Sequence, residues 1–188
     1  MWGVQIVLAS RSPRRRKALR QIVGKFRAVA ASEPARAQGR SLVAKTRYLA
    51  LAKAKAAKKR FPRAIIITAD TLACCRGKLM RKAGSTKDAA GMLRRMSGQR
   101  LDVVTSIAVV KPGREEIVFW SEYGWVRFRI LTRDEINAYV HSGKWKGKAA
   151  AVNVEEKPVL DWIEKKGGEQ GAVIGLPLKR LKKELRKC

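Results

Sequence analysis

Histidine, cysteine and acidic residues are scarce in this chain of 188 residues, and each shortage excludes a kind of site. The single histidine, His141, excludes Ser-His-Asp catalysis and any metal site built on several imidazoles. The cysteines are an adjacent pair, Cys74 and Cys75, and a lone Cys188, so we expect reduced thiols and neither a disulfide framework nor zinc-ligand spacing. Any metal must therefore bind to oxygen ligands.

Long apolar runs are also missing. No run approaches the roughly 18 residues of a membrane span, and the first ten residues lead straight into a strand-like segment without a basic region or cleavage site. We therefore expect a cytoplasmic protein with no membrane partner. The hydrophobic content of 46% is enough for one sizeable core. This predicts a single domain over residues 1–188, or two small lobes that share a sheet.

Basic residues are in large excess, because 43 lysines and arginines face 15 acids and give a formal charge of +28. Such a field attracts nucleic acids, nucleotides or anionic surfaces. The basic residues are spread along the chain, so a solvated surface with non-specific nucleic-acid binding explains them as well as a dedicated site does. The five tryptophans and the other aromatic residues do not cluster with the arginines as a stacking platform would. We therefore expect no stacking platform for nucleic acids.

Strands alternate with helices along the first half of the chain. Apolar runs predict strands over 4–9, 26–31 and 64–70, and the third is the clearest buried strand because it is rich in isoleucine. Helices are predicted after Pro13, which suits a first turn, and over 41–60.

The second half continues this alternation after a hairpin that turns at Arg76-Gly77. The patterns predict helices over 86–98, 132–143 and from Pro177 onward, with a Thr132 and Glu135 capping box in the second of them. Strands are predicted over 101–110 and, as one strand or two, over 116–131. Crossovers mixed with hairpins indicate an α/β fold with a mixed twisted sheet flanked by helices.

The turn at residues 10–16 is the first candidate site. It places serine hydroxyls, arginine side chains and a helix N-terminus close together, and these groups bind phosphate oxygens. The alternative is that these arginines are simply solvated surface residues.

Two carboxylates form the second candidate site. Glu33 and Asp70 each follow a predicted strand, and a pair of carboxylates at strand ends can hold Mg²⁺ together with substrate phosphates. Asp70 could instead be a turn residue that Thr71 stabilises. Lys53, Lys82 and Glu155 are ordinary charged residues when they are judged by composition alone.

Read together, six segments resemble the Maf family from one end of the chain to the other: LASRSPRRRKAL, LALAKAKA, ADTLACCRGKLMRK, GMLRRMSGQRLDVVTSIAVV, VRFRILTRDEINAYVHSGKWKGKAAA and GAVIGLPLKRLKKEL. The resemblance implies a house-cleaning nucleoside triphosphate pyrophosphatase that removes modified or non-canonical nucleotides. It also implies a fold similar to that of inosine triphosphate pyrophosphatases, with two lobes around a central cleft. A divalent metal, Mg²⁺ or Mn²⁺, and a homodimer are implied as well.

The resemblance assigns roles to the candidate residues. Glu33 and Asp70 would hold the metal, with Asp70 the favoured general base. The other implied roles are phosphate and substrate binding by Ser10, Arg14, Arg15 and Thr71, phosphate contacts by Lys53 and Lys82 in the catalytic set, and base recognition by Glu155.

The chain departs from the family pattern at four positions. The family usually has proline where Ala83 stands, an acid where Lys144 stands, glycine where Ala150 stands and an aromatic residue where Val152 stands. Three of these positions surround the segment expected to line the base pocket, so they bear on specificity more than on chemistry.

The substrate signature is mixed. Family members that act on dTTP and UTP share the double arginine after Pro13 but commonly carry glutamine at position 155, whereas members that act on 7-methyl-GTP more often carry glutamate there. Glu155 thus leaves dTTP and UTP, 7-methyl-GTP and a broader set open. The alternative from another class is a basic nucleic-acid-binding protein on a catalytically degenerate Maf-like scaffold.

Overall fold

The computed structural model describes residues 4–187 apart from 33, 35 and 36. Its strands are β1 (Ile6–Ala9), β2 (Arg27–Val29), β3 (Ile65–Cys75), β4 (Lys78–Met80), β5 (Arg100–Val110), β6 (Ile117–Phe128) and β7 (Ile163–Gly168). Its α-helices are α1 (Pro13–Arg20), α2 (Leu42–Arg60), α3 (Thr86–Met96), α4 (Arg133–His141), α5 (Gln170–Ile174) and α6 (Leu178–Arg186), and a 3₁₀ helix, η1, covers Val159–Trp162.

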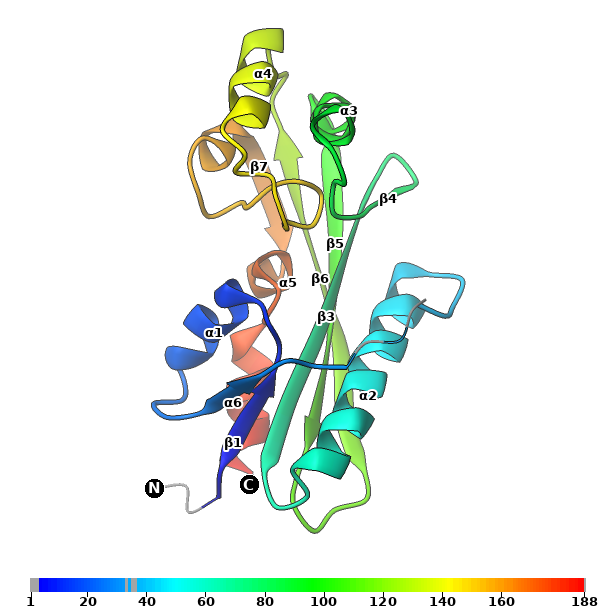
Figure 1. Ribbon diagram of the computed structural model, residues 1–188, viewed down its shortest axis with the longest axis vertical. Helices are drawn as coiled ribbons and strands as arrows, with labels where there is room; N and C mark the ends of the chain where they lie inside the picture. Colours follow the sequence, from blue (N-terminus) through cyan, green and yellow to red (C-terminus); the bar gives the residue numbers. More distant parts are fainter. Residues whose placement is uncertain (1–3, 33, 35–36, 188) are drawn as a thin grey trace. The chain divides into compact units, whose positions relative to one another are not determined.

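The sheet is mixed, and its strand order is β2-β1-β3-β5-β6-β7, with β4 paired to β3. Strand β1 runs parallel to both β2 and β3, whereas β4 is antiparallel to β3 and β7 is antiparallel to β6. The predicted class, α/β with a mixed sheet flanked by helices, is confirmed (Figure 1).

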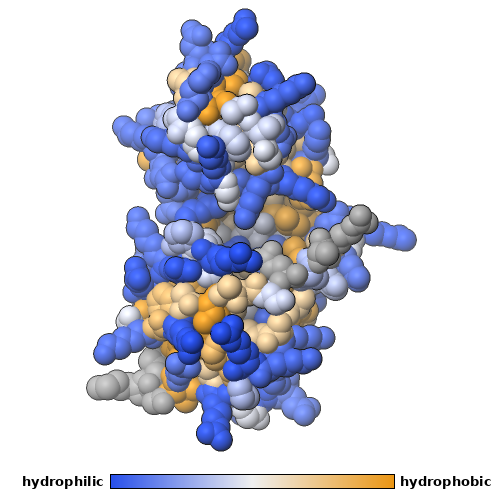
Figure 2. Space-filling view, viewed as in Figure 1, coloured by the Kyte–Doolittle hydropathy of each residue, from blue (hydrophilic) through white to orange (hydrophobic). Residues whose placement is uncertain are grey.

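The chain divides into two compact units. Unit 1 comprises Met1–Thr71, Val104–Glu122 and Ile174–Cys188, and unit 2 comprises Leu72–Val103 and Tyr123–Val173. Strands β3, β5 and β6 contribute residues to both units. Hydrophilic side chains project from both units (Figure 2), which agrees with a basic charge that is spread along the chain.

Unit 1 buries both faces of its strands. One face packs against α1 and α6 through residues such as Leu19 and Leu181, which are 0% exposed. The other face packs against an alanine-rich side of α2, where Ala50 and Ala54 contact the cluster that contains Ile66. Small residues let this helix approach the sheet closely, and α2 can therefore bring a long side chain to the strands it covers.

The helix starts in unit 1 follow the sequence signals. Pro13 occupies the first turn of α1, and the Ser12 hydroxyl accepts a hydrogen bond from the Arg15 N–H. Ser41 caps α2 in the same way, through the Ala44 N–H. Helix α1 carries Arg14 and Arg15, and α2 carries Lys53. The two caps therefore fix the first residue of each helix that presents a candidate site residue.

Strand β3 is longer than the sequence predicted. The expected end at Asp70 was wrong, because the strand continues through Asp70 to Cys75 before the predicted turn at Arg76 and Gly77. Pairing with β1 ends much earlier, at the Leu8 and Ile67 pair. Asp70 is therefore an interior residue of β3 that lies beyond the end of its parallel neighbour.

Unit 2 has a core on one face of its strands only. Leu93 and Met96 of α3 and Ile136 of α4 pack with Val126 and Phe128 of β6 in this core. Strand β7 was not predicted, because its sequence IEKKGG has no apolar alternation. It pairs with β6 from Phe128 to Gly124.

Helix α4 begins with the predicted capping box, and Glu135 makes it sensitive to acid. The Glu135 carboxylate accepts hydrogen bonds from Arg129 and from the Thr132 N–H, and these bonds lower its pKa from 4.5 to about 2. A lowered folded-state pKa contributes stability above pH 4.5 that is lost as the pH falls toward 2.

We expect Glu135→Gln to lower the free energy of unfolding by about 1 kcal/mol near neutral pH, because the capping bond and the ion pair are both weakened. The difference from the original protein should shrink through the window between pH 4.5 and pH 2. Urea unfolding of both proteins across this range measures it. A constant difference at all pH values would contradict this role of the carboxylate.

Within the described residues, no helix combines the length and the apolar character that crossing a membrane requires. Cys74 and Cys75 are both free thiols, and burial raises the pKa of the Cys75 thiol. Cys188 lies outside the described residues.

Candidate active site

Arg15 is held at the centre of a hydrogen-bonded cluster in unit 1. Its Nε donates to the Gly175 carbonyl oxygen at 2.9 Å, its Nη1 to Ser10 Oγ at 3.3 Å and its Nη2 to Thr71 Oγ1 at 2.9 Å. These partners come from three segments: the turn after β1, strand β3 and the loop after α5. The guanidinium group therefore ties the predicted phosphate-binding turn to the rest of unit 1.

The turn itself is ordered by its serines. The Ser12 N–H donates to Ser10 Oγ at 3.2 Å, and the Arg15 N–H donates to Ser12 Oγ at 3.4 Å. Arg14 lies beside Arg15 in the first turn of α1. This end of the helix carries the positive end of the helix dipole, so the turn combines a cationic group with a favourable place for anions.

Gly175 is fitted to this cluster by its lack of a side chain. Its φ angle is +102°, a conformation that L residues rarely adopt. A Cβ at this position would lie 3.2 Å from Thr71 Oγ1 and 3.6 Å from Arg15 Nε. Glycine therefore allows the backbone to approach Arg15 closely enough to accept its hydrogen bond.

Lys53 and Asp70 form a buried ion pair. Lys53 Nζ lies 2.5 Å from Asp70 Oδ1, and the two residues are 3% and 8% exposed. Lys53 projects from the alanine-rich side of α2, and Asp70 lies on β3. Charges are almost never buried in proteins unless they are paired. The burial of this pair therefore sets it apart from the many solvated charges of the chain.

Consecutive residues of β3 join the two groups of side chains. Side chains alternate across a strand, so Asp70 faces Lys53 on α2 while Thr71 faces Arg15 on α1. Strand β1 ends at Ala9, just before Ser10, and leaves this part of β3 beyond its pairing. The sequence thus brings a carboxylate, a lysine and the arginine cluster to one short stretch of strand.

Thr105 supports the cluster from behind and was not predicted. Its Oγ1 lies 2.7 Å from Thr71 Oγ1, and the residue is completely buried. The only sequence signal is a pair of hydroxyl residues, Thr105 and Ser106, inside an otherwise apolar strand. Buried hydroxyls require partners, so this pair indicated a polar contact without identifying it.

The Asp70 carboxylate is a type of ligand that hard cations prefer. Mg²⁺ and Mn²⁺ bind to carboxylate oxygens and complete their coordination with waters and substrate phosphates. The described residues contain no group of three or more histidine, cysteine or acidic side chains that could hold a metal alone. Asp70 can thus supply one ligand, and the other predicted ligand, Glu33, lies outside the described residues.

Lys82 and Glu155 lie in unit 2, so their grouping with Asp70 stays a prediction. Lys82 forms an isolated bridge with Ala149, which attaches it to the segment that leads to Glu155. The Glu155 N–H donates to Asn153 Oδ1 at 3.3 Å. Asn153 is 4% exposed and also donates to Glu156. The segment before Glu155 is therefore anchored by its own side chains.

The structure explains one departure from the expected pattern. Ala150 has a φ angle of +53°, in the left-handed region where glycine is favoured. It is also 1% exposed, and it belongs to the core of unit 2. The alanine keeps the left-handed conformation that a glycine would adopt freely, so this substitution preserves the local backbone.

Comparison with known proteins assigns the family. The chain matches the model of the Maf-like proteins over residues 5–188. The chain belongs to the Maf family.

Similar proteins include "dTTP/UTP pyrophosphatase" of Symbiobacterium thermophilum, which is 37% identical over 94% of this chain and 90% of its own length. The protein with the same name from Pyrococcus horikoshii is 34% identical over 94% and 92%. The Staphylococcus aureus Ham1 protein shares the fold, with a TM-score of 0.55, 14% identity and coverage of 97% and 98%.

Proposed function

We propose that this protein is a house-cleaning nucleoside triphosphate pyrophosphatase that hydrolyses dTTP and UTP to the monophosphate and pyrophosphate. The observation that carries the proposal is the buried ion pair between Lys53 of α2 and Asp70 of β3, whose next residue, Thr71, belongs to the Arg15 cluster. The relatives named dTTP/UTP pyrophosphatases support the choice of substrate. A degenerate scaffold that only binds nucleic acids is not favoured, because Lys53 is paired with Asp70 and Arg15 is bonded to Ser10 and Thr71.

The residues have complementary roles in this reaction. The Arg14 and Arg15 turn binds the triphosphate and faces the charge that develops on the pyrophosphate leaving group. Asp70 takes the proton of the attacking water, and Lys53 keeps the carboxylate in place. A bound Mg²⁺ or Mn²⁺ would supply Lewis-acid stabilisation of the phosphate charge, held by Asp70 and, in the prediction, Glu33. Lys82 and Glu155 complete the proposal as a phosphate contact and a base contact.

Thr105 acts as a positioning residue in this scheme. We expect Thr105→Val to lower kcat by about tenfold with little change in KM, because Thr71 loses the buried partner that orients it toward Arg15. Thr105→Ser keeps the hydroxyl and should restore most of the turnover. Steady-state kinetics of both variants checks this, with a thermal melt to show that they fold. Equal losses in the two variants would point to packing instead of orientation.

The proposal is tested by pyrophosphate release with Mg²⁺ across dTTP, UTP, CTP, ITP, 7-methyl-GTP and the common nucleotides. We expect dTTP and UTP to be the best substrates. If 7-methyl-GTP were the one nucleotide hydrolysed, the proposed reaction would stand but the proposed substrates, dTTP and UTP, would be wrong. No release with any nucleotide would refute the proposed function.

Glu155→Gln tests base recognition within the same panel. A glutamine amide both donates and accepts hydrogen bonds, whereas a carboxylate only accepts them. We expect the variant to raise the preference for dTTP and UTP over 7-methyl-GTP by about tenfold in kcat/KM. Glu164→Gln makes the same change at an exposed acid of β7 and should leave the ratio unchanged. An unchanged ratio in Glu155→Gln would remove this residue from the base site.

A further inference from the structure

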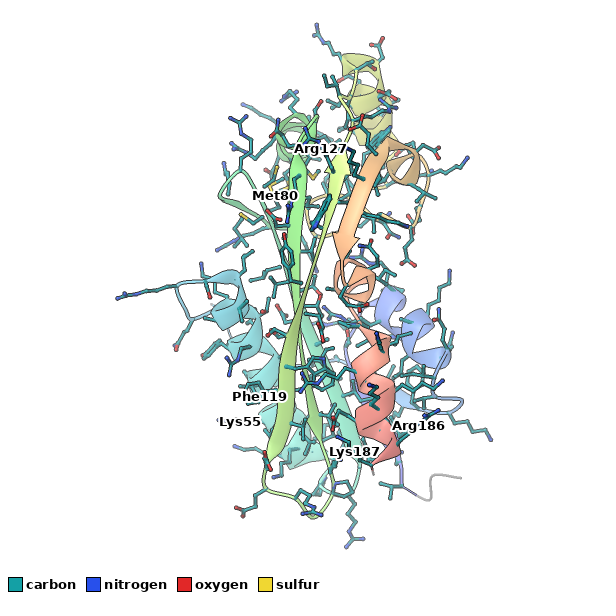
Figure 3. All side chains as sticks on the ribbon, turned by 180° about the vertical axis from the view of Figure 1, so that it is seen from behind. Lys55, Met80, Phe119, Arg127, Arg186 and Lys187 are labelled. Atoms are coloured by element: carbon teal, nitrogen blue, oxygen red, sulfur yellow. The ribbon has the colours of Figure 1, made fainter. Side chains whose placement is uncertain are left out.

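The sheet of unit 2 has a second face that none of the described helices of this unit covers. Side chains of β6 alternate, so Val126 and Phe128 enter the core while Tyr123, Trp125 and Arg127 point to the opposite face. Figure 3 shows β5, β6 and β7 around Arg127 without a helix of unit 2 in front of them. We call this surface the open face.

Aromatic rings and an arginine are stacked on the open face. The Arg100 guanidinium carbon lies 4.4 Å from the ring centroid of Trp125 and 5.7 Å from that of Tyr123. Arg100 also donates to Asp102 at 2.8 Å, and the Tyr123 hydroxyl donates to the same carboxylate at 2.5 Å. The sequence analysis did not foresee this contact between an arginine and two aromatic rings, because Arg100 on β5 reaches Tyr123 and Trp125 only through the pairing of β5 with β6.

The rings of Tyr123 and Trp125 are both partly exposed. Tyr123 is 42% exposed. Trp125 pairs with Gly167 of β7, where an added Cβ would lie 2.6 Å from the indole ring. The indole therefore lies directly on the backbone of β7, and glycine is the residue that permits this. A ring held in this way supports the Arg100 guanidinium plane at little conformational cost.

The charge of the open face is positive. Arg100 and Arg127 lie on β5 and β6, and Lys165 lies opposite Arg127 on β7, while Asp102 is the acid among them. All three basic residues are exposed. Phosphate groups of a polyanion fit such a surface. Two copies of the open face would bring like charges together, so the charge argues against a second copy of this chain as the occupant.

We propose that the open face binds single-stranded nucleic acid, independently of nucleotide hydrolysis. Unpaired bases stack on the exposed ring of Tyr123 and on the guanidinium plane of Arg100, which lies over the Trp125 ring. Arg127 and Lys165 pair with the phosphates on either side. A duplex hides its base faces, so it meets only the charges of this surface. The basic residues of the open face, which form part of the large positive charge of the chain, would thus bind the phosphates of a nucleic acid.

The test is fluorescence anisotropy of the full chain with a labelled oligothymidylate of about 12 nucleotides, and with a duplex of the same length, over a series of salt concentrations. The double variant Tyr123→Ala and Trp125→Ala should bind the single strand at least about tenfold more weakly, because each stacked base is lost. Its salt dependence should stay the same, since the phosphate contacts remain. Duplex binding should not change.

A matched control exists in unit 1 at Phe119 (Figure 3), which is 38% exposed. The Arg47 guanidinium carbon lies 4.5 Å from the centroid of its ring. Phe119→Ala makes the same kind of change elsewhere and should leave single-strand affinity unchanged. Trp125→Phe keeps an aromatic ring and should retain most of the single-strand affinity. If the double variant does not fold, Tyr123→Ala alone, at an exposed position, provides the test of single-strand affinity.

Three results would overturn the proposal. The first is equal affinity for single strand and duplex, which would mean general attraction by charge. The second is a single-strand affinity of the double variant that equals that of the original protein. Tyr123→Ala alone takes the place of the double variant if the latter does not fold. The third is a dimer in sedimentation that becomes a monomer on Tyr123→Ala, which would make the open face an interface between copies. Pyrophosphate release should be unchanged in every variant.

Discussion

Replacing Asp70 with asparagine should lower turnover by about a thousandfold or more, the largest effect expected for any single side chain of this protein. Asparagine keeps the shape of the side chain but can neither take a proton from water nor offer a charged ligand to a metal. It also leaves Lys53 buried, at 3% exposure, without its carboxylate. Pyrophosphate release at saturating UTP measures the loss in turnover.

Two controls separate chemistry from folding in this experiment. Breaking a buried ion pair costs about 3–5 kcal/mol, so the Asp70→Asn protein must be shown by circular dichroism to be folded at the assay temperature. Asp161→Asn changes an exposed acid of η1 in the same way and should keep full activity. A folded Asp70→Asn protein with near-normal turnover would exclude Asp70 as the base and as an essential metal ligand.

Replacing Arg15 with lysine should lower kcat/KM by about a hundredfold, although the charge is kept. The guanidinium group joins the Gly175 carbonyl, Ser10 Oγ and Thr71 Oγ1 through three different nitrogen atoms. A single ammonium cannot span these acceptors, so the turn loses its fixed geometry while phosphate attraction remains. We therefore expect most of the loss in kcat and a smaller change in KM, as measured by steady-state kinetics.

Arg20→Lys is the matched control for Arg15→Lys, because it makes the same substitution at an exposed position in the last turn of α1. It should leave both kinetic constants near their original values. If Arg15→Lys were as active as this control, the hydrogen-bonded cluster would not be needed to position the phosphate groups, and the arginine would serve by charge alone.

Local signals in the sequence predicted most of the fold. Capping residues and apolar periodicity gave the starts of α1, α2, α3 and α4, because these features act within a few residues. The sequence analysis ended β3 at Asp70, because a carboxylate after an apolar run suggested a strand boundary. The strand instead continues through residues 71–75, TLACC. Strand β7 was missed because its pairing with β6 depends on the partner strand and on Gly167, which makes room for Trp125.

The candidate site also contains residues that the sequence predicted and residues that it did not. Ser10, Arg15 and Thr71 were predicted from the turn and from the family resemblance, and the structure joins them by hydrogen bonds. Thr105 and Gly175 were not predicted, since their roles depend on contacts across long stretches of chain. Gly175 is 160 residues from the arginine that it accepts a bond from. Nothing in the local sequence specifies such a contact.

The most direct test of the proposed reaction is to hydrolyse UTP in ¹⁸O-labelled water with Mg²⁺ and to locate the label by mass spectrometry. Attack at the α-phosphorus, with Asp70 as the base, predicts UMP that carries one labelled oxygen and pyrophosphate that carries none. Label in the pyrophosphate, or products consisting of UDP and orthophosphate, would contradict this account.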